Sequence, residues 1–174
     1  MVKILEKLKY EQTLCEIYFE DGSRRFSVGY ITDCDEDFTL FEKISPDGRW
    51  DGFECRLTED IKMLQTDTGL LRSLEKLMPF YNFNHKEIPL DGKTVLDGLL
   101  EYIRNGRKIC RLESYRGCDL SGYILSIEEG VVEIAILDEL GRSDGVGYIL
   151  KEDIDYISVD SEDELRHAIL SKNK

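Results

Sequence analysis

The 174-residue chain contains no apolar run that approaches the roughly 20 residues needed to cross a bilayer as a helix. Its first residues, Met-Val-Lys-Ile-Leu-Glu-Lys-Leu, lack the long apolar core and the small-residue cleavage site of a signal peptide. We therefore expect a cytoplasmic protein that has no membrane partner.

Basic residues are scarce relative to acidic ones. Lysine and arginine number 23 against 36 aspartates and glutamates, which gives a net charge of −13. Nucleic-acid binding draws most of its affinity from cations that neutralise phosphates, and anionic membranes attract proteins in the same way. The charge therefore argues against a nucleic-acid partner, although it does not exclude a local basic patch.

The motifs of common catalytic and metal sites are also missing. The five cysteines form no Cys-x-x-Cys and leave one thiol unpaired in any disulfide scheme, which fits a reducing compartment. Only two histidines occur, His85 and His167, and neither lies in a nucleophile motif. No glycine-rich phosphate loop, zinc spacing or cofactor fingerprint is found. We predict that the protein is not an enzyme and has no metal and no cofactor.

Three alternating aspartates, Asp33, Asp35 and Asp37, are the one group that invites a metal interpretation. They match the start of a calcium loop, but the glycine and the terminal glutamate of such a loop are absent. We therefore interpret them as a solvated turn.

What the chain does contain is an internal repeat. Residues 29–67 align with residues 122–160 at a constant offset of 93 without a gap, and 13 of the 39 aligned positions are identical. The shared motifs are Gly-Tyr-Ile, Gly-Arg-x-Asp-Gly and Leu-x-Glu-Asp-Ile. Such self-similarity indicates two copies of one structural unit.

Each copy reads as a short helix followed by five short strands. Apolar residues at helical spacing predict helices near residues 4–8 and over residues 95–104. Alternating apolar residues between turn signals, including Asp21-Gly22, predict the strands. They are expected over residues 13–20, 25–32, 38–44, 52–57 and 61–65, and again over residues 108–114, 119–126, 131–137, 145–150 and 154–159. Closure into a barrel would remove the exposed edges of such short strands.

The opening helix, the Gly-Tyr-Ile strand after an Asp-Gly hairpin and the ending Leu-Thr-Glu-Asp-Ile-Lys-Met-Leu resemble the Sm-like family of small SH3-like barrels. The resemblance covers both copies and implies a mainly β fold with short helices. It implies two tandem Sm-like/SH3-like five-stranded antiparallel barrels, each preceded by an α-helix.

RNA binding does not follow from this resemblance. The family holds RNA with an asparagine after the second strand and with an Arg-Gly pair before the last strand. Residues 33–39 contain no asparagine, and Arg56-Leu57-Thr58 and Ile149-Leu150-Lys151 lack the glycine. The resemblance therefore implies the fold alone.

We expect three segments: a first barrel with its helix over residues 1–70, a linker over residues 71–92, and a second barrel over residues 93–174 that ends in a helix capped by Ser161. The linker is partly helical and then aromatic, unlike a flexible Gly/Ser-rich linker. We expect it to pack along a barrel or in the groove between the two.

The preferred function is that of a non-enzymatic binding or scaffold module that acts through a protein partner. Strand edges and exposed aromatic residues are common elements of peptide recognition. The candidate contacts are the only tryptophan and the linker aromatics, namely Trp50, Phe80, Tyr81 and Phe83. A homodimer also remains open.

Two other functions remain open. An RNA- or other nucleic-acid-associated protein of Sm-like descent would use the one basic stretch, which comprises Arg104, Arg107, Lys108 and Arg111. Alternatively, the acidic surface mimics nucleic acid and inhibits a basic partner.

Overall fold

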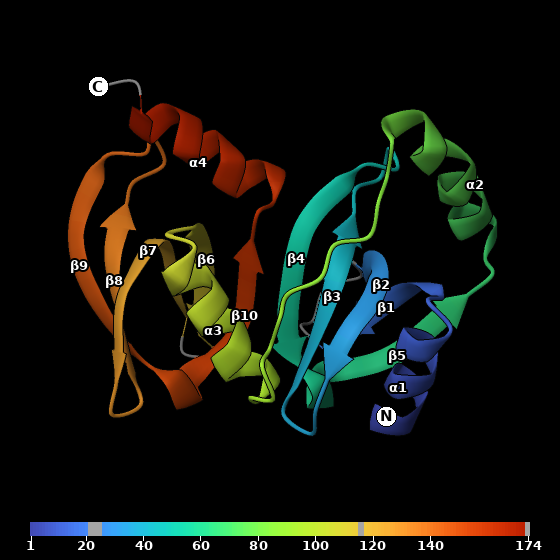
Figure 1. Cartoon of the computed structure of the whole chain (residues 1–174), viewed down its shortest axis with the longest axis horizontal. Helices are drawn as coiled ribbons and strands as arrows, with labels where there is room; N and C mark the ends of the chain where they lie inside the picture. The colour runs from blue at the N-terminus through green and yellow to red at the C-terminus, as the bar shows by residue number, and fades with distance from the viewer. Residues whose placement is uncertain (21–25, 115–116, 173–174) are drawn as a thin grey trace. The chain divides into compact units, whose positions relative to one another are not determined.

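The computed structural model describes residues 1–20, 26–114 and 117–172. The chain divides into two compact units, Met1–Ile88 and Pro89–Lys174. Figure 1 draws the first from blue to light green and the second from yellow to red. The expected Asp21-Gly22 turn lies outside the described residues.

The two units share one order of elements. Unit 1 comprises α1 (Val2–Tyr10), β1 (Leu14–Phe19), β2 (Phe26–Cys34), β3 (Phe38–Ile44), β4 (Trp50–Leu57), η1 (Thr58–Asp60), β5 (Ile61–Thr66), α2 (Gly69–Leu77) and η2 (Met78–Tyr81). Unit 2 comprises α3 (Val95–Asn105), β6 (Ile109–Ser114), β7 (Cys118–Glu128), β8 (Val131–Leu137), β9 (Ser143–Leu150), η3 (Lys151–Asp153), β10 (Ile154–Val159) and α4 (Glu162–Lys172). Because α2 and α4 begin 93 residues apart, the structural repeat extends beyond the segment of sequence identity.

Within each unit the strands form an antiparallel sheet. The order is β5-β1-β2-β3-β4 in unit 1 and β10-β6-β7-β8-β9 in unit 2. The mainly β fold with short helices is confirmed. These pairings do not establish that either sheet closes into a barrel, which stays a prediction.

The second strand of each unit contains a glycine that no other residue can replace unless the neighbouring backbone shifts. A Cβ atom at Gly29 would lie 2.3 Å from the carbonyl oxygen of Glu42, and one at Gly122 would lie 1.9 Å from that of Ala135. Just after each glycine the pairing with the next strand shifts register. The missing side chain lets the neighbouring backbone approach closely, as is usual for glycine at a bulge.

Helices and linker residues cover both faces of the unit 1 sheet. Beneath α1, apolar residues form one buried cluster, which comprises Leu5, Leu8, Cys15, Ile17, Phe19, Ile31, Phe41 and Ile61. Beneath α2 lies a second cluster, which comprises Leu14, Val28, Ile44, Leu71, Leu74 and Met78, with Tyr30 and Phe83 packed against it. The aromatic linker is therefore part of the packing of unit 1.

The repeated Gly-Arg-x-Asp-Gly motif forms a turn that abuts the last helix of its unit. Gly48 and Gly141 are the first residues of the two copies of the motif, and they have φ of 86° and 71°. A Cβ at Gly48 would lie 2.9 Å from the Cβ of Leu77, and one at Gly141 would lie 2.9 Å from the carbonyl oxygen of His167. Both the positive φ and the lack of space require glycine here.

We predict that Gly141→Ala lowers the free energy of unfolding by about 2 to 4 kcal/mol, through backbone strain together with the clash against α4. Gly130→Ala is the matched control, because Gly130 has φ of 80° but no atom within 4 Å of the added Cβ. Its free energy of unfolding should fall only by the backbone strain, about 1 to 2 kcal/mol. Chemical denaturation measures both values, and equal losses would contradict the packing of this turn against α4.

All five cysteines are free. Cys15, Cys55 and Cys110 are buried. Burial raises the pKa of Cys15 to about 12 and the pKa of Cys34 to about 11, and it also raises the pKa of Cys55 and of Cys110. Cys118 is the exposed thiol. Since the thiolate is the reactive form, the buried thiols should be inert in the folded chain.

We predict that a disulfide reagent at pH 8 labels Cys118 fast and Cys34 slowly, and labels the three buried thiols only after unfolding. Mass spectrometry of the labelled chain with time measures this order. Cys118→Ser should remove the fast phase. Fast labelling of Cys15 or Cys110 in the folded chain would contradict their burial.

Candidate functional site

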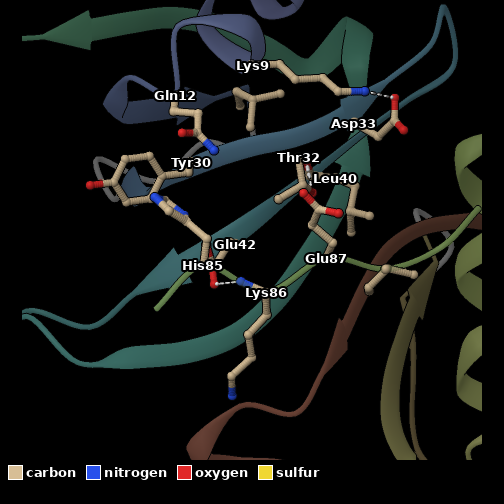
Figure 2. A pocket seen from close by; sticks show the side chains of 12 residues that line it. Lys9, Gln12, Tyr30, Thr32, Asp33, Leu40, Glu42, His85, Lys86 and Glu87 are labelled. Carbon is tan, nitrogen blue, oxygen red and sulfur yellow. Dashed lines mark hydrogen bonds and ion pairs between the residues drawn. The ribbon is translucent and has the colours of Figure 1, made fainter. Parts of the chain in front are cut away.

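Two pockets on unit 1 meet at one side chain, Lys86. Figure 2 shows the first, which we call the Glu42 pocket; it has a volume of about 270 Å³ and is lined by residues of β2 and β3 and by residues 85–88. The second, the Trp50 pocket, has a volume of about 420 Å³. It is lined by Arg49, Trp50, Tyr81, Asn82, Phe83, Asn84 and Lys86. Residues 82–88, which we call the strap, contribute to both pockets.

The Glu42 carboxylate holds the strap on β3. Its side chain is fully buried, with an exposed fraction of 0%. Its Oε1 accepts a hydrogen bond from the backbone N–H of Lys86 at 2.9 Å, and its Oε2 lies 2.9 Å from Nδ1 of His85 (Figure 2). A buried carboxylate is unfavourable unless it is well hydrogen-bonded. These two contacts therefore offset the burial of Glu42 and fix the path of the strap.

Aromatic rings complete this contact. The His85 ring meets the Tyr30 ring edge-on, with centroids 4.6 Å apart, and Phe83 stacks on Tyr30 at 5.8 Å. Burial, together with the nearby Glu75 and Glu42 carboxylates, raises the pKa of Tyr30 to about 12. Tyr30 therefore stays neutral at physiological pH and packs on the strap as an aromatic surface.

The Glu42–His85 pair resembles the base and its orienting carboxylate in a catalytic triad, but its neighbours do not supply the third member. The only hydroxyl group from β2 or β3 in the pocket besides Tyr30 is that of Thr32, and it donates a hydrogen bond to the carbonyl of Leu40 at 3.1 Å. A nucleophile needs a base within hydrogen-bond reach. The geometry of the pair is that of a clamp on the strap.

In the Trp50 pocket two cations lie on two aromatic rings. The Nζ atom of Lys86 lies 3.0 Å from the centroid of the Trp50 ring, and Cζ of Arg49 lies 4.8 Å from that of Tyr81. The Trp50 ring also meets Phe53 edge-on at 5.9 Å. The indole Nε1 is buried and has no hydrogen-bond partner among the described residues. The pocket thus combines apolar surface with two positive charges.

The structure brings together three of the four aromatic residues that the sequence singled out. Trp50, Tyr81 and Phe83 all line the Trp50 pocket. Phe80 lies beside them in η2 with 82% of its surface exposed and does not line the pocket. Sequence reasoning missed the two cations of this pocket. Arg49 directly precedes Trp50, and Lys86 follows Phe83 by three residues.

Sequence reasoning also missed Glu42 and His85. The signal for Glu42 was its place among the alternate residues Phe38, Leu40 and Ile44 of β3, because a carboxylate buried in an apolar row requires a partner. The sequence could not identify that partner because His85 is 43 residues away along the chain.

The basic stretch lies on unit 2, at the end of α3 and along β6. Nζ of Lys108 lies 2.9 Å from both carboxylate oxygens of Asp160. Arg111 forms a two-pronged contact with Asp119 at 2.9 and 2.7 Å. Two of the four predicted cations are therefore already paired with acidic residues, which reduces their attraction for phosphate. The other two, Arg104 and Arg107, lie at the end of α3 and just after it.

The alternating aspartates lie at the β2–β3 turn. Oδ1 of Asp35 accepts hydrogen bonds from the backbone N–H groups of Asp37 and Phe38 at 3.0 and 2.7 Å, and Asp33 pairs with Lys9 at 2.9 Å. Within the described ranges, no three His, Cys, Asp or Glu side chains are grouped so as to hold a metal ion. In the same ranges, none of the helices is long and apolar enough to cross a membrane.

No model of a known protein family matches the chain. No curated protein matches it either. Its function must therefore be inferred from the two pockets.

We predict that Glu42→Ala lowers the free energy of unfolding by about 2 to 3 kcal/mol, because the Lys86 N–H and the His85 ring lose their acceptor. Glu42→Gln retains one acceptor oxygen, so its free energy of unfolding should fall less than that of Glu42→Ala. Glu87→Ala is the control, since Glu87 is an exposed acid of the same strap. Trp50 is the only tryptophan, so its fluorescence should report release of Lys86 during chemical unfolding. Equal stability of Glu42→Ala and Glu87→Ala would contradict the clamp.

Proposed function

We propose that the chain is a non-enzymatic cytoplasmic adaptor that binds an acidic, partly apolar peptide segment of a protein partner in the Trp50 pocket. We also propose that its two units are tandem Sm-like barrels, which serve as the scaffold. Support for the barrels comes from the strand order that both units share, and from the close backbone approach at Gly29 and Gly122 with the register shift that follows it.

The pairing of two cations with two aromatic rings around one pocket carries the proposal. Arginine and lysine recognise carboxylates, and large aromatic rings supply apolar contact area at low entropic cost. Lys86 forms no ion pair with any described residue, in a chain of net charge −13. Within the described part of the chain, the acidic partner of Arg49 is the exposed Asp47, at 2.9 Å. Lys86 is therefore available to a carboxylate on a partner, whereas such a carboxylate would compete with Asp47 for Arg49.

The same pocket is less suited to single-stranded nucleic acid. Base recognition of this kind uses open aromatic faces on which bases stack. Here Lys86 covers the face of Trp50 and Arg49 covers that of Tyr81. A base would have to displace these cations, and its phosphates would meet a strongly acidic chain.

The Glu42 pocket has a supporting role in this proposal. Its clamp fixes Lys86 through the backbone N–H of that residue, so that the side chain lies over Trp50. Pre-organised contacts of this kind raise affinity because less freedom is lost on binding.

The test uses a fluorescein-labelled peptide, Asp-Leu-Asp-Phe-Asp-Leu, titrated into the full chain and followed by fluorescence anisotropy. We predict that Lys86→Ala and Arg49→Ala each weaken binding by about tenfold, which corresponds to about 1.4 kcal/mol. Lys3→Ala is the control, because Lys3 is an exposed cation on α1. Unchanged binding by Lys86→Ala, or tighter binding of a single-stranded RNA oligomer than of the peptide, would contradict the proposal.

A further inference from the structure

Unit 2 carries the counterpart of the sheet face on which the strap is clamped in unit 1. The register of β3 with β4 and of β8 with β9 places three cross-strand pairs in each unit at matching positions, 93 residues apart. In unit 1 the pairs are Phe38–Leu57, Leu40–Cys55 and Glu42–Phe53. In unit 2 they are Val131–Leu150, Glu133–Tyr148 and Ala135–Val146.

The two faces differ in exposure. Cys55 and Phe53 on β4 have exposed fractions of 0% and 2%. Their counterparts on β9, Tyr148 and Val146, have exposed fractions of 69% and 50%, and Leu150 in the same row has 43%. A continuous exposed row of large apolar side chains is typical of an interaction site.

Unit 1 shows how an extended segment binds to such a face. The strap crosses β3 at Glu42 (Figure 2). The backbone N–H of Lys86 and the ring of His85 both point at the carboxylate of that residue. Aromatic packing of Phe83 on Tyr30 accompanies these polar contacts. The pattern is that of an aromatic segment whose backbone N–H and imidazole ring are seated on a carboxylate of the sheet.

Unit 2 carries a carboxylate, Glu133, on the corresponding face. Its position matches Leu40, which lies one cross-strand pair away from Glu42 in unit 1. Glu133 accepts a hydrogen bond from the Tyr148 hydroxyl at 3.1 Å and another from the Ser126 hydroxyl at 3.0 Å. These hydroxyls orient the carboxylate without neutralising its charge. Because an ionised carboxylate accepts about four hydrogen bonds, acceptor capacity remains for a ligand.

The charged residues on the two strands themselves, Glu133 and Asp144, are both acidic. Neither β8 nor β9 contains a lysine or an arginine. Asp144 on β9 and Glu128 at the end of β7 are exposed and add negative charge nearby. Among the described residues, no cation forms a salt bridge with Glu133. A complementary ligand is therefore positively charged.

We propose that the β8–β9 face of unit 2, centred on Glu133 and Tyr148, binds an extended basic and apolar peptide segment of a protein partner. A lysine or arginine of the segment contacts Glu133, and neighbouring apolar side chains cover Val146 and Leu150. This surface selects a charge opposite to that selected by the Trp50 pocket. The chain would then connect two different peptide segments.

The experiment titrates two labelled peptides, Lys-Val-Lys-Phe-Lys-Val and its glutamate counterpart Glu-Val-Glu-Phe-Glu-Val, into the full chain by fluorescence anisotropy. The lysine peptide should bind and the glutamate peptide should not compete with it. Glu133→Gln and Tyr148→Ser should each weaken lysine-peptide binding at least tenfold. Glu59→Gln controls for net charge, since Glu59 is an exposed acid of unit 1. Equal effects of Glu133→Gln and Glu59→Gln would overturn the proposal.

Two further measurements keep this inference separate from the Trp50 pocket. Lys86→Ala should leave lysine-peptide binding unchanged, so that failure of one site does not imply failure of the other. Circular dichroism should show that Tyr148→Ser remains folded, as expected for an exposed side chain. A dimer of the wild-type chain that dissociates in Tyr148→Ser would overturn the proposal, because the occupant would then be a second copy.

Discussion

The burial of the Glu42 carboxylate is the constraint on which the candidate site depends. A charge with no exposure to water must be matched by hydrogen bonds, and the contacts of Glu42 with His85 and Lys86 come from the strap, 43 and 44 residues further along the chain. Satisfying Glu42 therefore determines the path of the strap. That path sets Lys86 over Trp50 and Phe83 against Tyr30, and it produces a pocket that neither β4 nor the strap would form alone.

The repeat supplies the scaffold, and the differences between its copies supply the candidate sites. Residues shared by both copies explain bends and turns, as Gly29 and Gly122 show with their close approach to the next strand. The Trp50 pocket, in contrast, combines the shared Arg49, which matches Arg142, with positions where the copies differ. Trp50 corresponds to Ser143 and Glu42 to Ala135, so unit 2 cannot build the same clamp. The two units therefore carry different candidate sites, the Trp50 pocket on unit 1 and the exposed β8–β9 face on unit 2.

Sequence patterns predicted the strands well because their signals are local. The bounds expected for β3, β8 and β10 agree with the structure, since alternating apolar residues and flanking turn residues determine them. The equivalence of α2 and α4 was missed, because the positions of Leu71 and Leu74 in the buried cluster of unit 1 hold Glu164 and His167 in unit 2. Aromatic residues indicated the Trp50 pocket, but long-range contacts determine which cations complete it.

Hydrogen exchange at the backbone N–H of Lys86 is the most direct test of the Glu42 clamp. The native chain should protect this N–H far more strongly than that of the exposed neighbour Glu87, because only the former has a buried acceptor. In Glu42→Ala the protection should disappear while that of core strands such as β3 persists. A Lys86 N–H that exchanges in the native chain as fast as an unprotected amide would contradict the account.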